Sequence, residues 1–243
     1  MKKLAIITVH NTSRYELEKT LKSIDRQIQK PDLSLVIAKQ VKGLNINNFK
    51  RKYRRFIIGK DNSLWNAMNI GIKNTKKYFI LFLNSGDRFY DDKSTFHINK
   101  NIKIKTSNYV FKTELIYDKM KLKPKTKYFL NNRYSPHPSF VRSPIHGKKA
   151  IFFSEENLIN SDGEWMRKER QNRGFKKIDK IISTHYLGGQ STNPSLNSIK
   201  ILFKDSILSG IKEIIKFAIH SILAKKYYYK LIYFFKYETR EKR

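Results

Sequence analysis

Two hydrophobic patterns alternate over about the first 90 residues of the chain. Four short, mostly apolar runs predict strands, and the first and the last of them are continuously apolar, which suits strands buried on both faces. These runs cover residues 4–9, 33–38, 55–58 and 78–83. Between them, helical spacing recurs at Leu17, Leu21 and Ile24, and again over residues 64–75, where Ser63 is placed to cap a helix. This alternation predicts an α/β fold with a mostly parallel central sheet flanked by helices.

The pattern is less regular beyond residue 90. Residues 109–117 and 127–130 are interpreted as strands, residues 154–174 as a helix around Trp165, and residues 175–184 as a late strand. From Ser195 onwards, apolar residues return at steps of three or four with lysines between them, which predicts a basic amphipathic helix. We therefore expect a folded domain over residues 1–194 and a helical tail over residues 195–243.

Polar clusters follow three of the predicted strands, at residues 10–13, 59–63 and 84–87. Ligands of parallel α/β sheets bind beyond the carboxyl ends of the strands, so these clusters are expected to share one crevice. Asp87 could hold Mg²⁺ or Mn²⁺ together with a diphosphate, because hard cations prefer oxygen ligands, or it could cap a turn. Asp61 could accept hydrogen bonds from a nucleobase or a ribose, or it could stabilise a helix N-terminus.

Composition and charge narrow the class of protein. The 243 residues carry 51 Lys and Arg against 20 Asp and Glu, and the net charge of +31 attracts nucleic acid, anionic lipids or phosphorylated substrates. A codon bias towards lysine is an alternative source of part of this charge. The absence of cysteine excludes disulfides and thiolate metal sites and favours a reducing cytoplasm. The sequence predicts neither a signal peptide nor a membrane-spanning segment.

Two motifs about twenty residues apart carry a family resemblance. Residues 61–72 read DNSLWNAMNIGI, and residues 83–87 read LNSGD. Together they resemble glycosyltransferase family 2, the inverting enzymes of the GT-A fold, and within it the envelope-polysaccharide subgroup with the pattern PDxGIYDAMNxGI and LNSGD. The likeness extends over residues 3–192. It implies a Rossmann-like catalytic domain that uses a nucleotide-sugar donor.

The resemblance implies roles around the donor. Asp87 is implied to be the metal-binding carboxylate, for Mg²⁺ or Mn²⁺, and Asp61 is implied to contact the nucleoside of a UDP- or GDP-sugar. The loop after the first strand is implied to border the base. The implied donor-binding residues are His10, Asn11, Asp61, Asn84, Ser85 and Asp87.

Three further blocks resemble the acceptor side of the family's site. Residues 159–165 are similar to its SDxxW/L block, whose Asp is the catalytic base, which implies Asp162 here with Glu164 as the alternative. An inverting enzyme needs such a carboxylate to take the proton of the acceptor hydroxyl. His137 falls in a block similar to HQSxF and is implied to bind acceptor or diphosphate; a structural histidine is the alternative. Gly189 falls in a block similar to the terminal GGxS loop, which closes over the site.

Two departures from the family pattern remove acids near the donor. Many members carry Asp-Gly-Ser after the second strand, where residues 38–40 here read AKQ, and the usual Asp of YDAMN is Asn66. The departures imply a different nucleotide or a weaker enzyme. Activity is still expected, because Asp61, Asp87 and Asp162 are all present.

The sequence therefore predicts an inverting glycosyltransferase that transfers a sugar to a glycolipid or oligosaccharide acceptor of the lipid-linked or lipopolysaccharide type. Its tail is expected to lie on an anionic membrane surface, at the inner face of a bacterial inner membrane, with a helix packed back on the domain as the alternative. A nucleic-acid-binding protein is disfavoured, because no helix-turn-helix, zinc-finger or RNP-type motif is present. A non-catalytic, glycosyltransferase-like protein is the other alternative, which the missing Asp-Gly-Ser favours.

Overall fold

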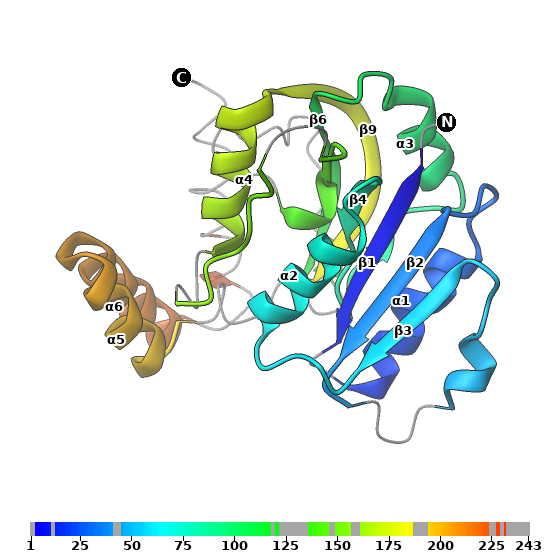
Figure 1. Cartoon of the computed structure of the whole chain (residues 1–243). Coiled ribbons are helices and arrows are strands. Elements are labelled where there is room, and N and C mark those ends of the chain that lie inside the picture. Colours follow the sequence, from blue (N-terminus) through cyan, green and yellow to red (C-terminus); the bar gives the residue numbers. More distant parts are fainter. Residues whose placement is uncertain are drawn as a thin grey trace.

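The structure is a computed structural model, and it describes residues 3–10, 13–40, 45–117, 120–121, 136–145, 149–156, 161–186, 194–223, 227–228 and 231. Within these residues a single sheet forms the centre of the protein (Figure 1). Its strands are β1 (Leu4–His10), β2 (Leu33–Ala38), β3 (Arg54–Ile58), β4 (Phe79–Phe82), β5 (Arg88–Phe89), β6 (Asn108–Tyr117), β7 (Met120–Lys121), β8 (Phe140–Arg142) and β9 (Phe175–Tyr186).

Helices cover both faces of this sheet (Figure 1). They are α1 (Arg14–Asp25), α2 (Leu64–Asn74), α3 (Ser94–Asn101) and α4 (Ser161–Arg173). Two further helices, α5 (Leu196–Asp205) and α6 (Ile207–Ile222), lie to one side of the sheet, and the 3-10 turns are η1 (Ile46–Phe49) and η2 (His137–Ser139). Serine side chains cap four of these helices. Ser13 accepts a hydrogen bond from the backbone N–H of Glu16, and Ser63 accepts one from that of Asn66. Ser195 and Ser206 cap α5 and α6 in the same way.

The strands follow the order β3-β2-β1-β4-β8-β6-β9-β5, and β7 pairs with β6 outside this row. The first four strands are parallel neighbours, which confirms the arrangement predicted from the alternating pattern. Beyond β4 the sheet is mixed, because β8 runs antiparallel to both β4 and β6 while β9 runs parallel to β6. The carboxyl ends of β1 and β4 therefore lie side by side at one edge of the sheet.

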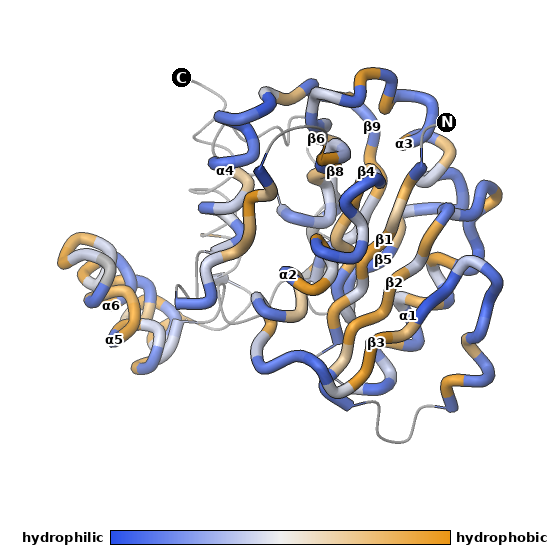
Figure 2. Tube along the Cα trace, viewed as in Figure 1, coloured by the Kyte–Doolittle hydropathy of each residue, from blue (hydrophilic) through white to orange (hydrophobic). Residues whose placement is uncertain are grey.

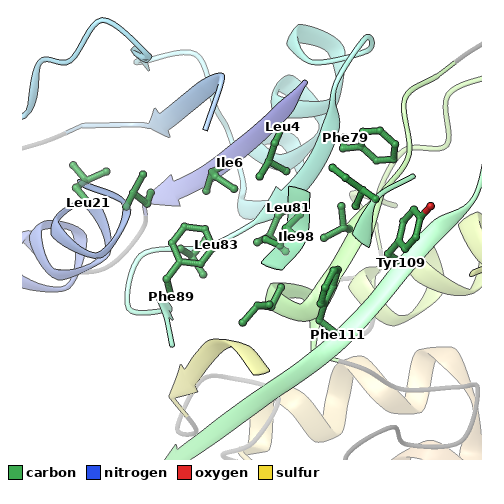
Figure 3. Packing of buried hydrophobic residues seen from close by; sticks show 14 of the residues in the cluster. Leu4, Ile6, Leu21, Phe79, Leu81, Leu83, Phe89, Ile98, Tyr109 and Phe111 are labelled. Carbon is green, nitrogen blue, oxygen red and sulfur yellow. The ribbon is translucent and has the colours of Figure 1, made fainter. Parts of the chain in front are cut away.

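Buried side chains on β1 alternate between two hydrophobic clusters. Leu4 and Ile6 belong to the cluster that contains the buried residues of α1, and Figure 3 shows Leu81 next to them and Leu21 further along the same cluster. Ala5 and Ile7 face the opposite cluster, which contains residues of α2 and α4. The continuous apolar run thus reflects a strand that is covered on both sides.

Gly71 explains one position of the DNSLWNAMNIGI motif. A Cβ atom at this residue would lie 2.8 Å from Cγ2 of Ile7, closer than side-chain carbons approach each other. Helix α2 therefore rests directly against β1. A larger residue would push the helix away.

The second half of the chain corrects part of the sequence interpretation. Of the helix expected over residues 154–174, the structure describes α4 over Ser161–Arg173, whereas residues 154–156 are not helical. There the Glu155 carboxylate accepts hydrogen bonds from Asn66 and Asn69 of α2. The strand expected over residues 127–130 lies outside the described residues. None of the helices that the structure describes has the length and apolar content needed to cross a bilayer.

Candidate active site

His10 and the segment 84–87 meet where β1 and β4 end. The Ser85 backbone N–H donates to the Val9 carbonyl at 3.0 Å, and the Ser85 hydroxyl lies 3.1 Å from Nδ1 of His10. These contacts follow directly from the parallel pairing of β1 with β4, which brings residues 75 positions apart to the same edge. Two of the polar clusters predicted to share a crevice are therefore adjacent.

The turn that carries Asp87 is held by Thr20 of α1. The Thr20 hydroxyl donates to the Asp87 carbonyl at 2.7 Å and accepts from the Gly86 N–H at 3.0 Å. Gly86 has φ +104°, a conformation that residues with a side chain rarely adopt. The glycine of the LNSGD motif is thus required by the backbone, and Thr20 fixes the direction in which Asp87 leaves the turn.

Replacing Thr20 with valine is expected to lower the free energy of unfolding by about 1–3 kcal/mol, because the buried carbonyl and N–H would each lose a hydrogen bond. Chemical denaturation measures this change. Thr8→Val is the matched control, because Thr8 is fully buried and its hydroxyl has no hydrogen-bond partner among the described residues. The control should be neutral or stabilising; an equal loss in both variants would remove the role of Thr20.

The Asp87 carboxylate lies between two imidazoles. It is only 5% exposed, its Oδ1 is 2.6 Å from Nδ1 of His185, and its Oδ2 is 3.2 Å from Nε2 of His137. Burial alone would raise the pKa of Asp87, but the charges and hydrogen bonds of His185 and His137 outweigh it and hold this pKa well below its usual range. Asp87 is therefore ionised at neutral pH.

His137 joins Asp87 to Asp162. Its other ring nitrogen, Nδ1, lies 3.8 Å from Oδ2 of Asp162. Burial lowers the pKa of His137, but the interactions with the negatively charged Asp162 and Asp87 outweigh burial and raise this pKa to about 9. The Asn84 amide nitrogen also lies 3.2 Å from Nε2; a protonated imidazole only donates, which favours the amide orientation that presents oxygen there.

Asp162 stands at the start of α4, where its Oδ1 accepts a 2.8 Å hydrogen bond from the Gly163 N–H. Burial raises the pKa of Asp162, but the interactions with His137, followed by that hydrogen bond, lower it overall. The carboxylate is about one-third exposed and so remains accessible. It combines the two properties of a proton acceptor for a bound hydroxyl: it is ionised, and it can be reached.

Asp61 follows β3 and borders His10. Burial lowers the pKa of His10, and the charge of Asp61 partly opposes this. Asp61 is itself buried, and its Oδ1 has no hydrogen-bond partner among the residues that the structure describes. A buried carboxylate oxygen without a partner is costly, so this atom is suited to accept a hydrogen bond from a ligand.

The other residues singled out from the sequence make other contacts or lie outside the described residues. Glu164 is one residue beyond Gly163 on α4, and its carboxylate lies 2.6 Å from the Lys168 ammonium. Asn66, which stands where the family pattern has an acid, donates to Glu155 at 3.1 Å, a contact that an Asp could not make. Asn11 and Gly189 lie outside the described residues.

Asp87 and His185 fit a divalent metal ion only as part of its coordination shell. Among the described residues, no group of three or more His, Cys, Asp or Glu side chains is arranged to hold a metal. A carboxylate and an imidazole nevertheless suit Mn²⁺, and a bound diphosphate with water could complete the shell. The side chains of Asp87 and His185 are therefore compatible with a metal ion that binds together with a diphosphate.

Two residues of this site were not identified from the sequence. The sequence motifs gave His185 no role, yet its Nδ1 lies 2.6 Å from Oδ1 of Asp87, across 98 positions of the chain. Thr20 was not singled out, because a threonine on an amphipathic helix carries no chemical signature. The one sequence signal for His185 was its position at the end of the predicted late strand. Thr20 had no such signal.

The fold of this protein is similar to that of solved structures. Crystal structures of S. aureus TarS share it: residues 1–349 superimpose with a TM-score of 0.64 over 93% of this chain and 68% of that one, at 15% identity. The corresponding structure in complex with UDP-GlcNAc gives a TM-score of 0.62 over 98% of this chain and 74% of that one, also at 15% identity. A third, in complex with UDP, gives 0.63 at 15% identity, over 93% and 68%. The expected α/β architecture is thereby confirmed.

No family profile matches the sequence, and no curated protein matches it.

Proposed function

We propose that this protein is an inverting glycosyltransferase that takes a sugar from a nucleotide-sugar donor. The observation that carries the proposal is the contact series Asp87–His137–Asp162 at the carboxyl edge of the parallel strands. The shared fold supports it, because TarS, which has this fold, has been crystallised in complex with the nucleotide-sugar UDP-GlcNAc. A UDP-sugar is accordingly the first donor to test.

The transfer is a single displacement. The acceptor hydroxyl oxygen attacks the anomeric carbon, the bond from that carbon to the diphosphate oxygen breaks, and its electron pair leaves with the nucleoside diphosphate. Asp162 takes the hydroxyl proton, since it is ionised and accessible. Attack from the face opposite the leaving group inverts the anomeric configuration.

Other residues hold the donor. Asp61 and His10 border the nucleoside end, where the unpartnered Oδ1 of Asp61 would accept a hydrogen bond from a ribose hydroxyl or base. Protonated His137 is placed to stabilise negative charge near Asp87. A divalent ion held by Asp87 and His185, when bound, would supply further neutralisation of the diphosphate.

The acceptor is a saccharide, of the lipid-linked or lipopolysaccharide type. The net charge of +31 suits an acceptor that itself carries phosphate groups or sits among anionic lipids. This part of the proposal rests on charge and on the resemblance of the sequence motifs, whereas the donor is supported by the site geometry and the fold.

A panel of UDP- and GDP-sugars tests the donor. At about 100 times its dissociation constant, a true donor stabilises the folded state by about 2.7 kcal/mol, which corresponds to a rise in Tm of about 5–10 °C. We expect UDP-GlcNAc with Mn²⁺ to produce such a shift and to release UDP slowly, and EDTA to abolish most of both effects. The measurements are thermal unfolding and UDP release.

The two alternative classes give different results in the same panel. Donor binding without UDP release, in the presence of saccharide-lipid acceptors, would point to a non-catalytic protein. Salt-dependent binding of random DNA, together with no response to any nucleotide-sugar, would point to a nucleic-acid-binding protein instead.

A further inference from the structure

Helices α5 and α6 form a hairpin that packs mainly against itself. Ser206 separates the two helices and caps α6 by accepting a 3.1 Å hydrogen bond from the Ser209 N–H. Gly210 lets the helices approach closely, because a Cβ there would lie 2.4 Å from Cγ of Phe203. The hairpin lies to one side of the sheet, beyond α4 (Figure 1).

The apolar side of α6 is not the side that contacts α5. Hydrophobic residues recur along both helices (Figure 2). On α6, the residues Ile207, Ile211, Ile214, Ile215 and Ile222 follow one another at helical spacing and form what we call the isoleucine face. Each of them is 44–82% exposed, whereas the buried residues of α6 are Gly210 and Glu213. A helix that belonged to a folded core would bury such a face.

The exposed charges of α6 are all positive, because its acidic residue is buried and its lysines are exposed. Glu213 is the one acidic residue of α6, and it is only 3% exposed, because it accepts hydrogen bonds from Ser198 at 2.8 Å and from Lys216 at 2.7 Å. The four lysines of the two helices are exposed: Lys200, Lys204, Lys212 and Lys216. The surface of α6 therefore combines isoleucine with lysine and shows no exposed carboxylate.

These features fit an anionic lipid bilayer better than a second copy of this chain. Two copies would each bring a net charge of +31 and repel one another, whereas lipid phosphates attract the lysines. Residues 195–243 alone carry eleven Lys or Arg against four Asp or Glu. Nucleic acid would match the lysines but would leave the isoleucine face in water.

We propose that the α5–α6 hairpin docks this protein on an anionic membrane surface, with the isoleucine face entering the boundary between headgroups and acyl chains. The lysines beside it contact lipid phosphates, and the protein is peripheral, at the cytoplasmic leaflet where anionic lipids are exposed to it. This inference does not rest on glycosyl transfer, since vesicle binding requires neither donor nor turnover.

Vesicle co-sedimentation of the full chain tests the proposal. Vesicles of phosphatidylcholine with about one-third phosphatidylglycerol should bind the protein, and vesicles of phosphatidylcholine alone should bind it at least about 10-fold less. The double variant Ile211→Gln and Ile215→Gln should lower the affinity for the anionic vesicles about 100-fold, because two exposed isoleucines no longer transfer out of water.

The matched control is Ile28→Gln with Ile104→Gln, two exposed isoleucines outside the hairpin, which should bind as the wild type does. Thermal unfolding establishes that both double variants are folded. Equal losses in the two variants, no binding by the wild type, or equal binding to neutral vesicles would each overturn the proposal. So would a wild-type dimer, detected by light scattering, that the hairpin substitutions dissociate.

Discussion

Asp87→Asn is expected to reduce sugar transfer by at least about 10²–10³-fold. An amide keeps the size of the carboxylate but removes the negative charge that faces His185 and His137 and would bind a cation. The loss should appear in turnover and also as a weaker stabilisation by donor and Mn²⁺ together. Steady-state kinetics and thermal unfolding with and without Mn²⁺ measure the two effects.

Asp92→Asn is the matched control for this experiment. Asp92 is exposed, lies five positions further along the chain, and undergoes the same chemical change. Its activity should stay within about 2-fold of the wild type, because a surface charge far from the substrate is screened. If Asp87→Asn retained full activity with a native Tm, Asp87 would have no place in the chemistry.

Asp162→Asn is expected to lower kcat by about 10²–10⁴-fold, the usual contribution of a general base. Asparagine can still accept the hydrogen bond from the Gly163 N–H, so the start of α4 should remain intact. The donor KM should change little, because Asp162 is proposed to act on the acceptor hydroxyl. Kinetics with saturating donor, together with circular dichroism, separate loss of the base from loss of the helix.

Glu164→Gln provides the comparison on the same helix. The Glu164 carboxylate contacts Lys168 one turn along α4, so its neutralisation should change kcat by less than about 3-fold. The opposite ranking, with Glu164→Gln inactive and Asp162→Asn active, would transfer the role of base to Glu164. The two variants therefore decide between the alternatives that the SDxxW-like block leaves open.

The first half of the fold could be predicted from the sequence because its signals are local. The runs that form β1 and β4 are nearly continuously apolar, β2 is rich in β-branched and aliphatic residues, and Ser63 stands at the start of α2 as expected. The second half depends on pairings between distant segments. Strands of two and three residues, such as β5 and β8, are too short to show any periodicity.

One part of the candidate site could be predicted from the sequence, and the other part could not. The expectation that the strand ends share a crevice agrees with the contact of His10 with Ser85, since parallel strands place their carboxyl ends together. The position of His137 between Asp87 and Asp162 could not be derived, because its segment, β4 and α4 meet only through the tertiary structure. The roles given to these residues stay predictions until the variants above are measured.

The short connection between β9 and α5 limits how far the candidate site could lie from a bilayer on which the hairpin is docked. His185, at the end of β9, and Ser195, the cap of α5, are ten positions apart, and ten extended residues span at most about 35 Å. A hairpin embedded among lipid headgroups would therefore keep Asp87 and Asp162 within a few tens of ångströms of them. A sugar close to the lipid could reach the site directly. The far end of a long polymer could receive a further sugar only if the polymer folded back towards the membrane.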